Sequence, residues 1–444
     1  MPAKPAKQQL APTVFFKKVC GEVYVRNVAT GEEFLFNAAA APVFAALRRG
    51  AARDAPALRG NAAFLRQLKS FGLLRAHTGG VRSRVTAVQK SDTTATDVPT
   101  DIAGHCQEVC RQRRRLWSAG LELTWRCNAR CRHCYLDIPE EQTAIDELSV
   151  AEWLSVIDQL SRMGCMNVLV TGGEPTLHSA FLPVCERIVN RGMLCDIYTN
   201  GIDIPDAMFG ALCKLPFNSV SVSLYSGTDA FHDEVTGIPG SFRRTLDTIL
   251  RFKEAGAAVY AKAPMFHGHL DDFFAAKELG ERLGFSVTPS NILVPGHSGS
   301  SRNGLMLDAG EYRSFLERET TPDAGEDIAS ARERRASEPI CQAGLTTLCV
   351  SPAGEVRPCN SFSAVCGNVR EAPLSQIWRT VDIFRRLRSL RRRDVSPRCS
   401  QCKDIAYCTV CPGASWSESG GTSISPSSWS CEQAAVRASF NRKS

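Results

Sequence analysis

The chain has 444 residues, more than one ordinary core needs, so two or three domains are expected. Hydrophobic residues make up 43% and charged residues 22%, which excludes a disordered or fibrous protein. The net charge of +7 is small for this length and does not by itself indicate a nucleic-acid partner. No apolar run is long enough to cross a membrane and the start lacks a signal-peptide core, so a soluble cytoplasmic protein is expected.

The first part of the chain is expected to hold a flexible start over 1–13 and a small domain over 14–76. The alternating runs GEVYVRNV and EEFLFN flank a turn and predict a β-hairpin, which Ala-rich helical segments follow. The stretch 77–117 is rich in Thr, Ser, Arg and Asp and has weak periodicity, which predicts a linker. Within it, Cys106 and Cys110 are spaced like neighbours on a helix.

Six short β-like runs alternate with helical patterns over 118–296. The runs are LELTW, NVLVTGG, CDIYTNG, SVSVSLY, AVYAKAP and FSVTPSN. Ser149 and Glu152 form a capping box before the first intervening helix. This alternation predicts an α/β fold with a parallel sheet or partial barrel, whose ligands bind at the carboxyl ends of the strands. A polar bridging segment with one or two surface helices is expected over 297–340, and a cysteine-dense domain that depends on metal over 341–444.

Cysteine is the unusual residue, with 19 copies in a chain that has no secretory signal. Because the cytosol keeps thiols reduced, this number indicates metal sites rather than disulfides. The loop after the first β-like run holds Cys127, Cys131 and Cys134 at C-x3-C-x2-C spacing. Three thiolates on a 4Fe-4S cluster leave one iron open to activate a second molecule. The alternative is a zinc ion with His133 as fourth ligand, which would strain the adjacent His133 and Cys134.

This motif, with Tyr135 beside it, resembles that of the radical S-adenosylmethionine (SAM) enzymes. The loop Thr171-Gly-Gly-Glu-Pro follows the second β-like run, and in that family such a loop lies against the methionine part of SAM. The resemblance implies a partial (β/α)6 barrel in which SAM yields a 5′-deoxyadenosyl radical. The implied SAM-binding residues are Tyr135, Gly172, Gly173, Glu174, Pro175, Thr199, Asn200, Ser221, Ser223 and Lys262. Ser221 and Ser223 are equally well explained as small inward residues of a strand, and Lys262 as a solvated side chain.

A second group of cysteines occupies the last hundred residues. It comprises Cys341, Cys359, Cys399, Cys402, Cys408, Cys411 and Cys431. The C-x2-C-x5-C-x2-C part alone fits a zinc ribbon, but that would leave three of the seven thiols unexplained. All seven together resemble the SPASM domain, which holds two auxiliary 4Fe-4S clusters.

The SPASM resemblance also implies how the thiols divide between the two clusters. It assigns Cys399, Cys402, Cys408 and Cys431 to one cluster, and Cys341, Cys359 and Cys411 to the other. Cys349 is a candidate fourth ligand for the second set, and the slightly favoured alternative is an iron left open for a substrate thiolate. The family usually has three residues between the last two cysteines of the run, whereas two separate Cys408 from Cys411, which makes the assignment of Cys411 less secure.

The amino-terminal runs VYVRNVATGEEFLFNAAAAPVFAALRRG and FLRQLKSFGLL resemble the winged-helix peptide-recognition domain of ribosomal-peptide biosynthesis. The resemblance implies that a leader peptide adds a strand beside 33–36 and packs against a helix near 63–71. A winged helix that binds DNA, or one that only packs on the barrel, is the alternative.

These resemblances predict a radical SAM oxidoreductase that modifies a ribosomally synthesised precursor peptide. The implied cofactors are SAM and three 4Fe-4S clusters, one for SAM and two auxiliary. The implied partners are the precursor peptide and an electron donor of flavodoxin or ferredoxin type, with no nucleic acid and no membrane. The favoured product is a thioether, with a carbon-carbon crosslink as the other option. The alternatives are a maturase that oxidises a residue of a folded protein and, in a different class, an iron-sulfur sensor that binds peptide or DNA.

Overall fold

The structure is a computed structural model that describes residues 8–51, 55–75, 101–137, 145–290, 292–297, 301–319 and 327–441. The chain divides into two compact units, Met1–Arg113 and Arg114–Ser444. None of the described helices combines the length and the hydrophobicity that a bilayer crossing requires.

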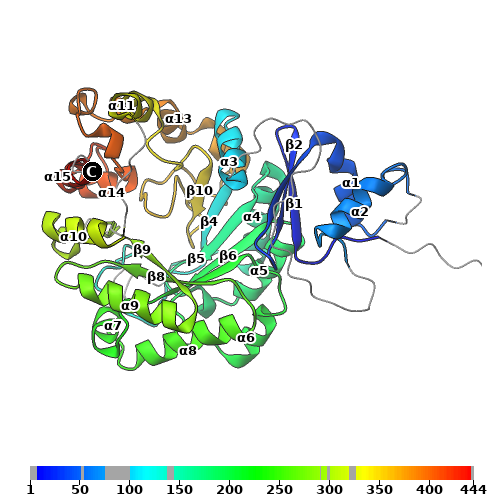
Figure 1. Ribbon diagram of the computed structural model, residues 1–444, viewed down its shortest axis with the longest axis horizontal. Coiled ribbons are helices and arrows are strands. Elements are labelled where there is room, and N and C mark those ends of the chain that lie inside the picture. Colours follow the sequence, from blue (N-terminus) through cyan, green and yellow to red (C-terminus); the bar gives the residue numbers. More distant parts are fainter. Residues whose placement is uncertain are drawn as a thin grey trace, which may run out of the picture. The chain divides into compact units, whose positions relative to one another are not determined.

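The first unit contains a three-stranded antiparallel sheet in the order β1-β2-β3 (Figure 1). Its strands are β1 (Val14–Val19), β2 (Glu22–Asn27) and β3 (Glu33–Asn37). The short helix η1 (Ala38–Ala40) and the helices α1 (Ala41–Arg48) and α2 (Ala62–Ser70) follow. Val23 and Val25 of β2 are fully buried against Phe44 and Leu47 of α1, so one face of the sheet packs on the helices. The predicted hairpin is present as β2 and β3.

Helix α3 (Ile102–Gln112) lies within the stretch predicted to be a linker. Asp101 caps it by accepting a hydrogen bond from the backbone N–H of Gly104 at 2.8 Å. Cys106 and Cys110 are buried, and Nε2 of His105 lies 3.1 Å from the Glu22 carboxylate on β2. The linker prediction is therefore wrong for this part, because a helix that buries small thiols leaves little apolar periodicity. The remainder, 77–100, lies outside the described residues.

The second unit is built on an eight-stranded sheet in the order β11-β10-β4-β5-β6-β7-β8-β9. Six of its strands are parallel and in chain order: β4 (Ser118–Glu122), β5 (Asn167–Thr171), β6 (Leu194–Thr199), β7 (Ser219–Ser223), β8 (Val259–Pro264) and β9 (Ser286–Ser290). The sheet is open, since β9 and β11 are its two edges, so the predicted α/β fold with a partial six-stranded barrel is confirmed.

Helices connect the parallel strands and cover the sheet. They are α4 (Val150–Met163), α5 (Phe181–Asn190), α6 (Asp206–Leu212), α7 (Asp229–Thr236), α8 (Ser241–Glu254) and α9 (Leu270–Leu283), and α6, α8 and α9 run along one side of the sheet in Figure 1. The predicted capping box starts α4. Trp153 and Ile157 of α4 and the alternate strand residues Val168 and Val170 are fully buried together, so the apolar core lies between helices and sheet.

The cysteine-rich segment continues the barrel sheet. Strand β10 (Thr347–Val350) pairs in parallel with β4, and β11 (Val356–Arg357) pairs antiparallel with β10. The backbone N–H groups of Trp117 and Ser118 donate to the carbonyl of Thr346 at 2.8 and 3.0 Å. This pairing starts β4 at Ser118, three residues before the predicted run LELTW.

The remaining elements are short. The bridging segment contains α10 (Ala309–Glu319) and α11 (Ile328–Ser337), as its polar pattern predicts. The cysteine-rich segment adds α12 (Leu374–Thr380), α13 (Asp382–Ser389), α14 (Pro412–Glu418) and α15 (Ser428–Asn441). One-turn helices are η3 (Pro175–Leu177), η4 (Asn303–Leu305), η5 (Arg392–Asp394), η6 (Pro397–Cys399) and η7 (Ile405–Tyr407).

Candidate functional site

The loops after β4 and β5 are joined by backbone hydrogen bonds at the carboxyl ends of their strands. The N–H of Gly173 donates to the carbonyl of Thr124 at 2.7 Å, and the N–H of Glu174 donates to the carbonyl of Arg126 at 2.9 Å. The first loop carries the C-x3-C-x2-C motif and the second the Gly-Gly-Glu-Pro sequence. The two motifs that the sequence singles out therefore form one structural unit, at the edge where parallel sheets bind ligands.

The two glycines of this unit are required by close backbone packing. Gly172 has a φ of +141°, and a Cβ there would lie 2.4 Å from the carbonyl oxygen of Thr124. A Cβ on Gly173 would lie 2.4 Å from the carbonyl oxygen of Arg126. The sequence predicts glycines here for a close approach to SAM, and the structure adds a second reason, because any side chain would push the cysteine loop away.

We expect Gly173→Ala to reduce SAM cleavage by about a hundredfold, the cost of displacing reacting groups by about 1 Å. The measurement is 5′-deoxyadenosine formation with dithionite and SAM. Gly210→Ala in α6 is the matched control, because a Cβ on Gly210 meets no atom within 4 Å. Equal activities of the two variants would show that the tight packing of Gly173 is unimportant.

Glu174 connects the second loop to the loop after β6. Its side chain is 1% exposed. One carboxylate oxygen accepts hydrogen bonds from the hydroxyls of Thr176 at 2.7 Å and Thr199 at 2.9 Å, and the other accepts from the backbone N–H of Asn200 at 2.8 Å. Burial raises the pKa of Glu174, and the hydrogen bonds oppose that shift. Glu174 thus holds Thr199 and Asn200, two other predicted SAM-binding residues, in place.

The three thiols of the first motif lie next to this unit. The amide nitrogen Nδ2 of Asn200 is 3.7 Å from Sγ of Cys127, and the hydroxyl of Tyr225 is 3.8 Å from Sγ of Cys131. Burial raises the pKa of Cys127 to about 11 and that of Cys131 to about 12, and the neighbouring thiols add to the shift. The backbone N–H of Cys134 donates to the carbonyl of Cys131 at 3.0 Å, so the three cysteines belong to one tightly turned loop.

The donor set fits a cluster better than a single ion. Within the described part of the chain, no three cysteine sulfur atoms all lie within 4.8 Å of one another, a spacing that the four ligands of one zinc ion need. The ring of His133 packs edge-on against Tyr225 and Phe266, with centroids 5.1 and 5.2 Å apart. Three neighbouring thiols with wider spacing suit a 4Fe-4S cluster held at three corners.

The cysteines of the carboxy-terminal segment form two further sets. Burial raises the pKa of Cys399, and Cys408, Cys431 and Cys402 raise it further. Burial likewise raises the pKa of Cys359, and Cys411 and Cys341 add to that shift. These electrostatic interactions follow the same grouping as the SPASM resemblance, and the two ligand sets, four thiols in one and three in the other, stay a prediction of that resemblance.

Cys349 lies beside the set of three but faces the barrel. It is 1% exposed on β10, and its sulfur accepts a hydrogen bond from the backbone N–H of Glu122 on β4. Burial is the largest cause that raises the pKa of Cys349, and the Glu122 carboxylate is the next. Cys359 is the one thiol that also raises this pKa. Cys349 thus packs against β4, where a Cβ on Gly120 would lie 3.4 Å from its sulfur.

The other predicted SAM-binding residues lie further along the sheet. Tyr135 donates its hydroxyl to the buried Glu122 at 2.8 Å. Lys262 on β8 is half-buried rather than solvated, with its ammonium 3.6 Å above the ring of Tyr198, and burial lowers its pKa to about 8. Ser221 and Ser223 lie on β7, the strand between β6, which carries Tyr198, and β8, which carries Lys262. Among the residues that the structure describes, no hydrogen bond joins Ser221 or Lys262 to the cysteine loop. Pro175 starts η3, and Glu174 is the residue before it.

Three buried polar residues of this region were missed from the sequence. Glu122 is fully buried. The one sequence feature that could have identified it is the position of a carboxylate inside the apolar run LELTW. Tyr225, at the end of SVSVSLY, contacts Cys131. Arg392 is 4% exposed and donates to the carbonyls of Cys408 at 3.0 Å and Ile340 at 3.2 Å, so it ties together the loops of the two carboxy-terminal sets. Its place in a basic run gives no hint of this role.

Two family profiles match the chain. The Radical SAM superfamily matches residues 121–276, and the SPASM iron-sulfur cluster-binding domain matches 341–403. The first match implies SAM with a 4Fe-4S cluster, and the second implies auxiliary iron-sulfur clusters.

Individual proteins are similar over most of the chain. The AdoMet-dependent heme synthase of Oleidesulfovibrio alaskensis is 25% identical over 325 residues, which cover 67% of this chain and 83% of that protein. The PqqA peptide cyclase of Granulibacter bethesdensis is 25% identical over 289 residues, which cover 60% of this chain and 75% of that protein. Among solved structures, Streptococcus suis SuiB bound to its precursor peptide SuiA has a TM-score of 0.61 at 15% identity, covering 95% of this chain and 99% of that one. The joined cysteine and glycine loops, the parallel barrel and the two profile matches agree, and the chain is a radical SAM enzyme with a SPASM iron-sulfur domain.

Proposed function

We propose that this radical SAM enzyme modifies a ribosomally synthesised precursor peptide by forming an intrapeptide crosslink, with a thioether favoured. The observation that carries the proposal is a strand edge suited to a peptide, in the same chain as the three-thiol site. Peptide-directed proteins are among the relatives, and the fold of a peptide-bound structure extends over nearly the whole chain.

The strand edge belongs to β3 in the first unit. Among the described residues, β3 pairs with β2 alone, so its other side can accept a further strand. Phe34 and Phe36 of β3 are half-buried, and their rings lie 5.1 Å from Phe71 and 5.6 Å from Phe64 respectively. A leader peptide that adds a strand there would meet this aromatic row beside α2. In the proposal, the domain over 14–76 holds the leader and the barrel over 118–296 modifies the core.

The chemistry rests on the group that the three thiols would hold. When bound, the 4Fe-4S cluster and SAM supply a 5′-deoxyadenosyl radical that removes a hydrogen atom from a carbon. Cys127, Cys131 and Cys134 would hold three corners of the cluster, while Gly172, Gly173, Thr199 and Asn200 would shape the SAM site with Glu174 as their brace. The chain's part is to hold the peptide carbon against this site and exclude water.

The two carboxy-terminal thiol sets would hold the second and third clusters. The set of Cys399, Cys402, Cys408 and Cys431 would supply four ligands, whereas Cys341, Cys359 and Cys411 would supply three. An iron without a protein ligand would be open to a thiolate of the peptide. Formation of the carbon-sulfur bond removes one hydrogen atom from carbon, and one proton and one electron from the thiol. The auxiliary cluster, when bound, would offer an acceptor for that electron, and a flavodoxin- or ferredoxin-type protein would supply the electron that starts each turnover.

The leader-binding step is tested with Phe34→Ala. We expect the KM for the full-length precursor to rise about tenfold, because a lost aromatic contact of about 1.5 kcal/mol corresponds to about that factor in affinity. Cleavage of SAM without peptide should be unchanged. Phe16→Ala on β1 is the matched control, since Phe16 packs on Phe44 in the same apolar core but belongs to the strand at the opposite edge of the sheet.

The reaction itself is tested by mass spectrometry of a candidate precursor peptide after incubation with SAM and dithionite. The proposal predicts loss of two hydrogen atoms and protection of one cysteine from alkylation. Equal effects of Phe34→Ala and Phe16→Ala on KM would contradict leader binding at β3.

The relatives named heme synthases favour a second candidate, a haem precursor as substrate. The two candidates differ in what the first unit should do, because a small tetrapyrrole needs no strand edge. If a haem precursor, and no peptide, stimulates 5′-deoxyadenosine formation, the second candidate replaces the first.

A further inference from the structure

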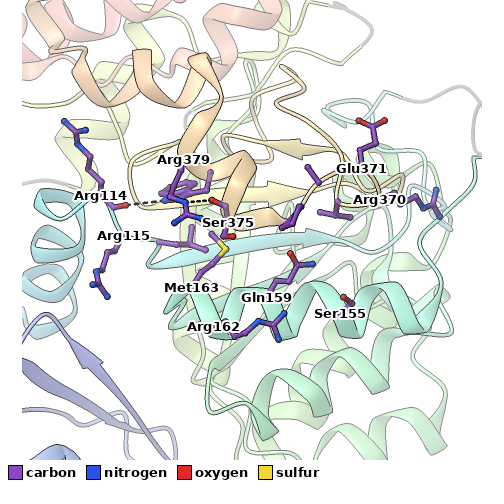
Figure 2. A pocket seen from close by; sticks show the side chains of 15 residues that line it. Arg114, Arg115, Ser155, Gln159, Arg162, Met163, Arg370, Glu371, Ser375 and Arg379 are labelled. Carbon is purple, nitrogen blue, oxygen red and sulfur yellow. Dashed lines mark hydrogen bonds between the residues drawn. The ribbon is translucent and has the colours of Figure 1, made fainter.

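A basic hollow lies on the second unit, away from the three joined loops. It has a volume of about 940 Å³ and is lined by α4, α12 and the segment before β4 (Figure 2). Its arginines are Arg114, Arg115, Arg162, Arg370 and Arg379, and we call it the arginine hollow. Glu371 is the one carboxylate among the lining residues, so the hollow is strongly positive.

Most of this charge is uncompensated. Arg370 is paired with Glu152 at 2.7 Å and Asp146 at 2.9 Å. The other four arginines are exposed and form no ion pair among the residues that the structure describes. Figure 2 shows the side chains of Arg114, Arg115 and Arg162 pointing in different directions. Guanidinium groups that spread in this way suit a broad acidic surface better than one small anion.

The arginine hollow is connected to the auxiliary set of three thiols by a short path. Trp378 lines the hollow, and the guanidinium of Arg388 lies 4.2 Å above its ring. Nε of Arg388 donates to the carbonyl of Gly344 at 3.0 Å. Gly344 is three residues after Cys341, and its N–H donates to the carbonyl of Pro358, the neighbour of Cys359, at 3.2 Å.

We propose that the arginine hollow is the docking surface for an acidic one-electron carrier protein. The proposal rests on the external electron donor of the proposed function and adds where that donor binds. The charge is complementary to an acidic carrier, and the contacts through Trp378, Arg388 and Gly344 lead to the backbone near Cys341 and beside Cys359, two cysteines of one auxiliary set. In each encounter the reduced carrier would give up one electron to an iron-sulfur cluster held by the chain and would leave oxidised by one electron, with no atom transferred. Interfaces between electron carriers and their partners bury little surface, and their affinity falls as the salt concentration rises.

The test is the double charge reversal Arg162→Glu/Arg379→Glu, with Arg243→Glu/Arg282→Glu as the matched control. Arg243 and Arg282 are exposed on α8 and α9, and neither lines the hollow. The first readout is the Kd of a purified oxidised flavodoxin at low salt. The second is the rate of 5′-deoxyadenosine formation with reduced flavodoxin and, separately, with dithionite, which needs no docking surface.

We expect the Kd to rise and the flavodoxin-driven rate to fall at least about tenfold in the Arg162/Arg379 variant, the usual range of electrostatic steering. The dithionite-driven rate and the control variant should match the wild type. Unchanged flavodoxin binding would overturn the proposal, and so would an equal loss with both reductants. A loss confined to peptide modification with dithionite would assign the hollow to an acidic part of the peptide instead. Peptide modification by the wild type with dithionite tests the proposed function independently of these outcomes.

Discussion

Replacing Cys127, Cys131 and Cys134 together by alanine is expected to abolish 5′-deoxyadenosine formation and to lower the iron content from about twelve to about eight atoms per chain. The cause is local, because these thiols occupy the loop that is hydrogen-bonded to Gly173 and Glu174. Iron and sulfide analysis of protein purified without oxygen, with chromatography of the nucleoside product, measures both effects.

His133→Gln, in the same loop, is the control for this experiment. His133 packs on Tyr225 and Phe266, so its replacement should leave the iron content unchanged. If a zinc ion occupied the loop with His133 as a ligand, this variant would lose the metal. A wild type with about four irons that fall to none, with zinc present, would show that the carboxy-terminal domain is a zinc scaffold and that auxiliary clusters play no part.

The parallel part of the fold could be predicted from the sequence because each strand has its own local signal. The runs around Val168, Val220 and Ala261 are short, apolar and separated by helical patterns, and all three lie in central strands. The capping box of Ser149 and Glu152 is equally local and starts α4 as predicted.

Long-range pairing could not be predicted in this way. The start of β4 at Ser118 depends on β10, whose Thr347 lies opposite it although more than two hundred residues separate them. Helix α3 escaped prediction because its buried face consists of the small thiols of Cys106 and Cys110. In both cases the element depends on contacts between residues whose local sequence has little hydrophobic periodicity.

In the candidate site, too, the residues with a local sequence signal could be predicted and those with long-range partners could not. Cysteine spacing is a local signal, and the predicted ligand sets depend on that signal and on the resemblance built on it. The braces of the site are nonlocal: Glu174 accepts hydrogen bonds from Thr199 and Asn200, and Arg392 joins the carbonyls of Ile340 and Cys408. A buried charge with partners from distant segments becomes visible when the chain is folded.

Cys359→Ser and Cys349→Ser are expected to differ sharply although the two cysteines lie close together. Cys359 shares its surroundings with Cys341 and Cys411, so its replacement should remove one auxiliary cluster, about four irons per chain, and abolish peptide modification. Cys349 is held by the N–H of Glu122 and packs opposite Gly120, where a Cβ would lie 3.4 Å from its sulfur. Cys349→Ser should therefore keep all irons and most of the activity.

The iron contents of Cys349→Ser and Cys359→Ser also decide between a thioether and a carbon-carbon crosslink as the product. If Cys349→Ser keeps the cluster, three protein ligands suffice and one iron is free to bind the thiolate of the peptide, which leads to a thioether. If Cys349→Ser loses as much iron as Cys359→Ser, the cluster has four protein ligands and no place for the peptide sulfur. A carbon-carbon crosslink would then be the expected product, since an auxiliary cluster with four protein ligands can accept an electron and cannot bind the thiolate.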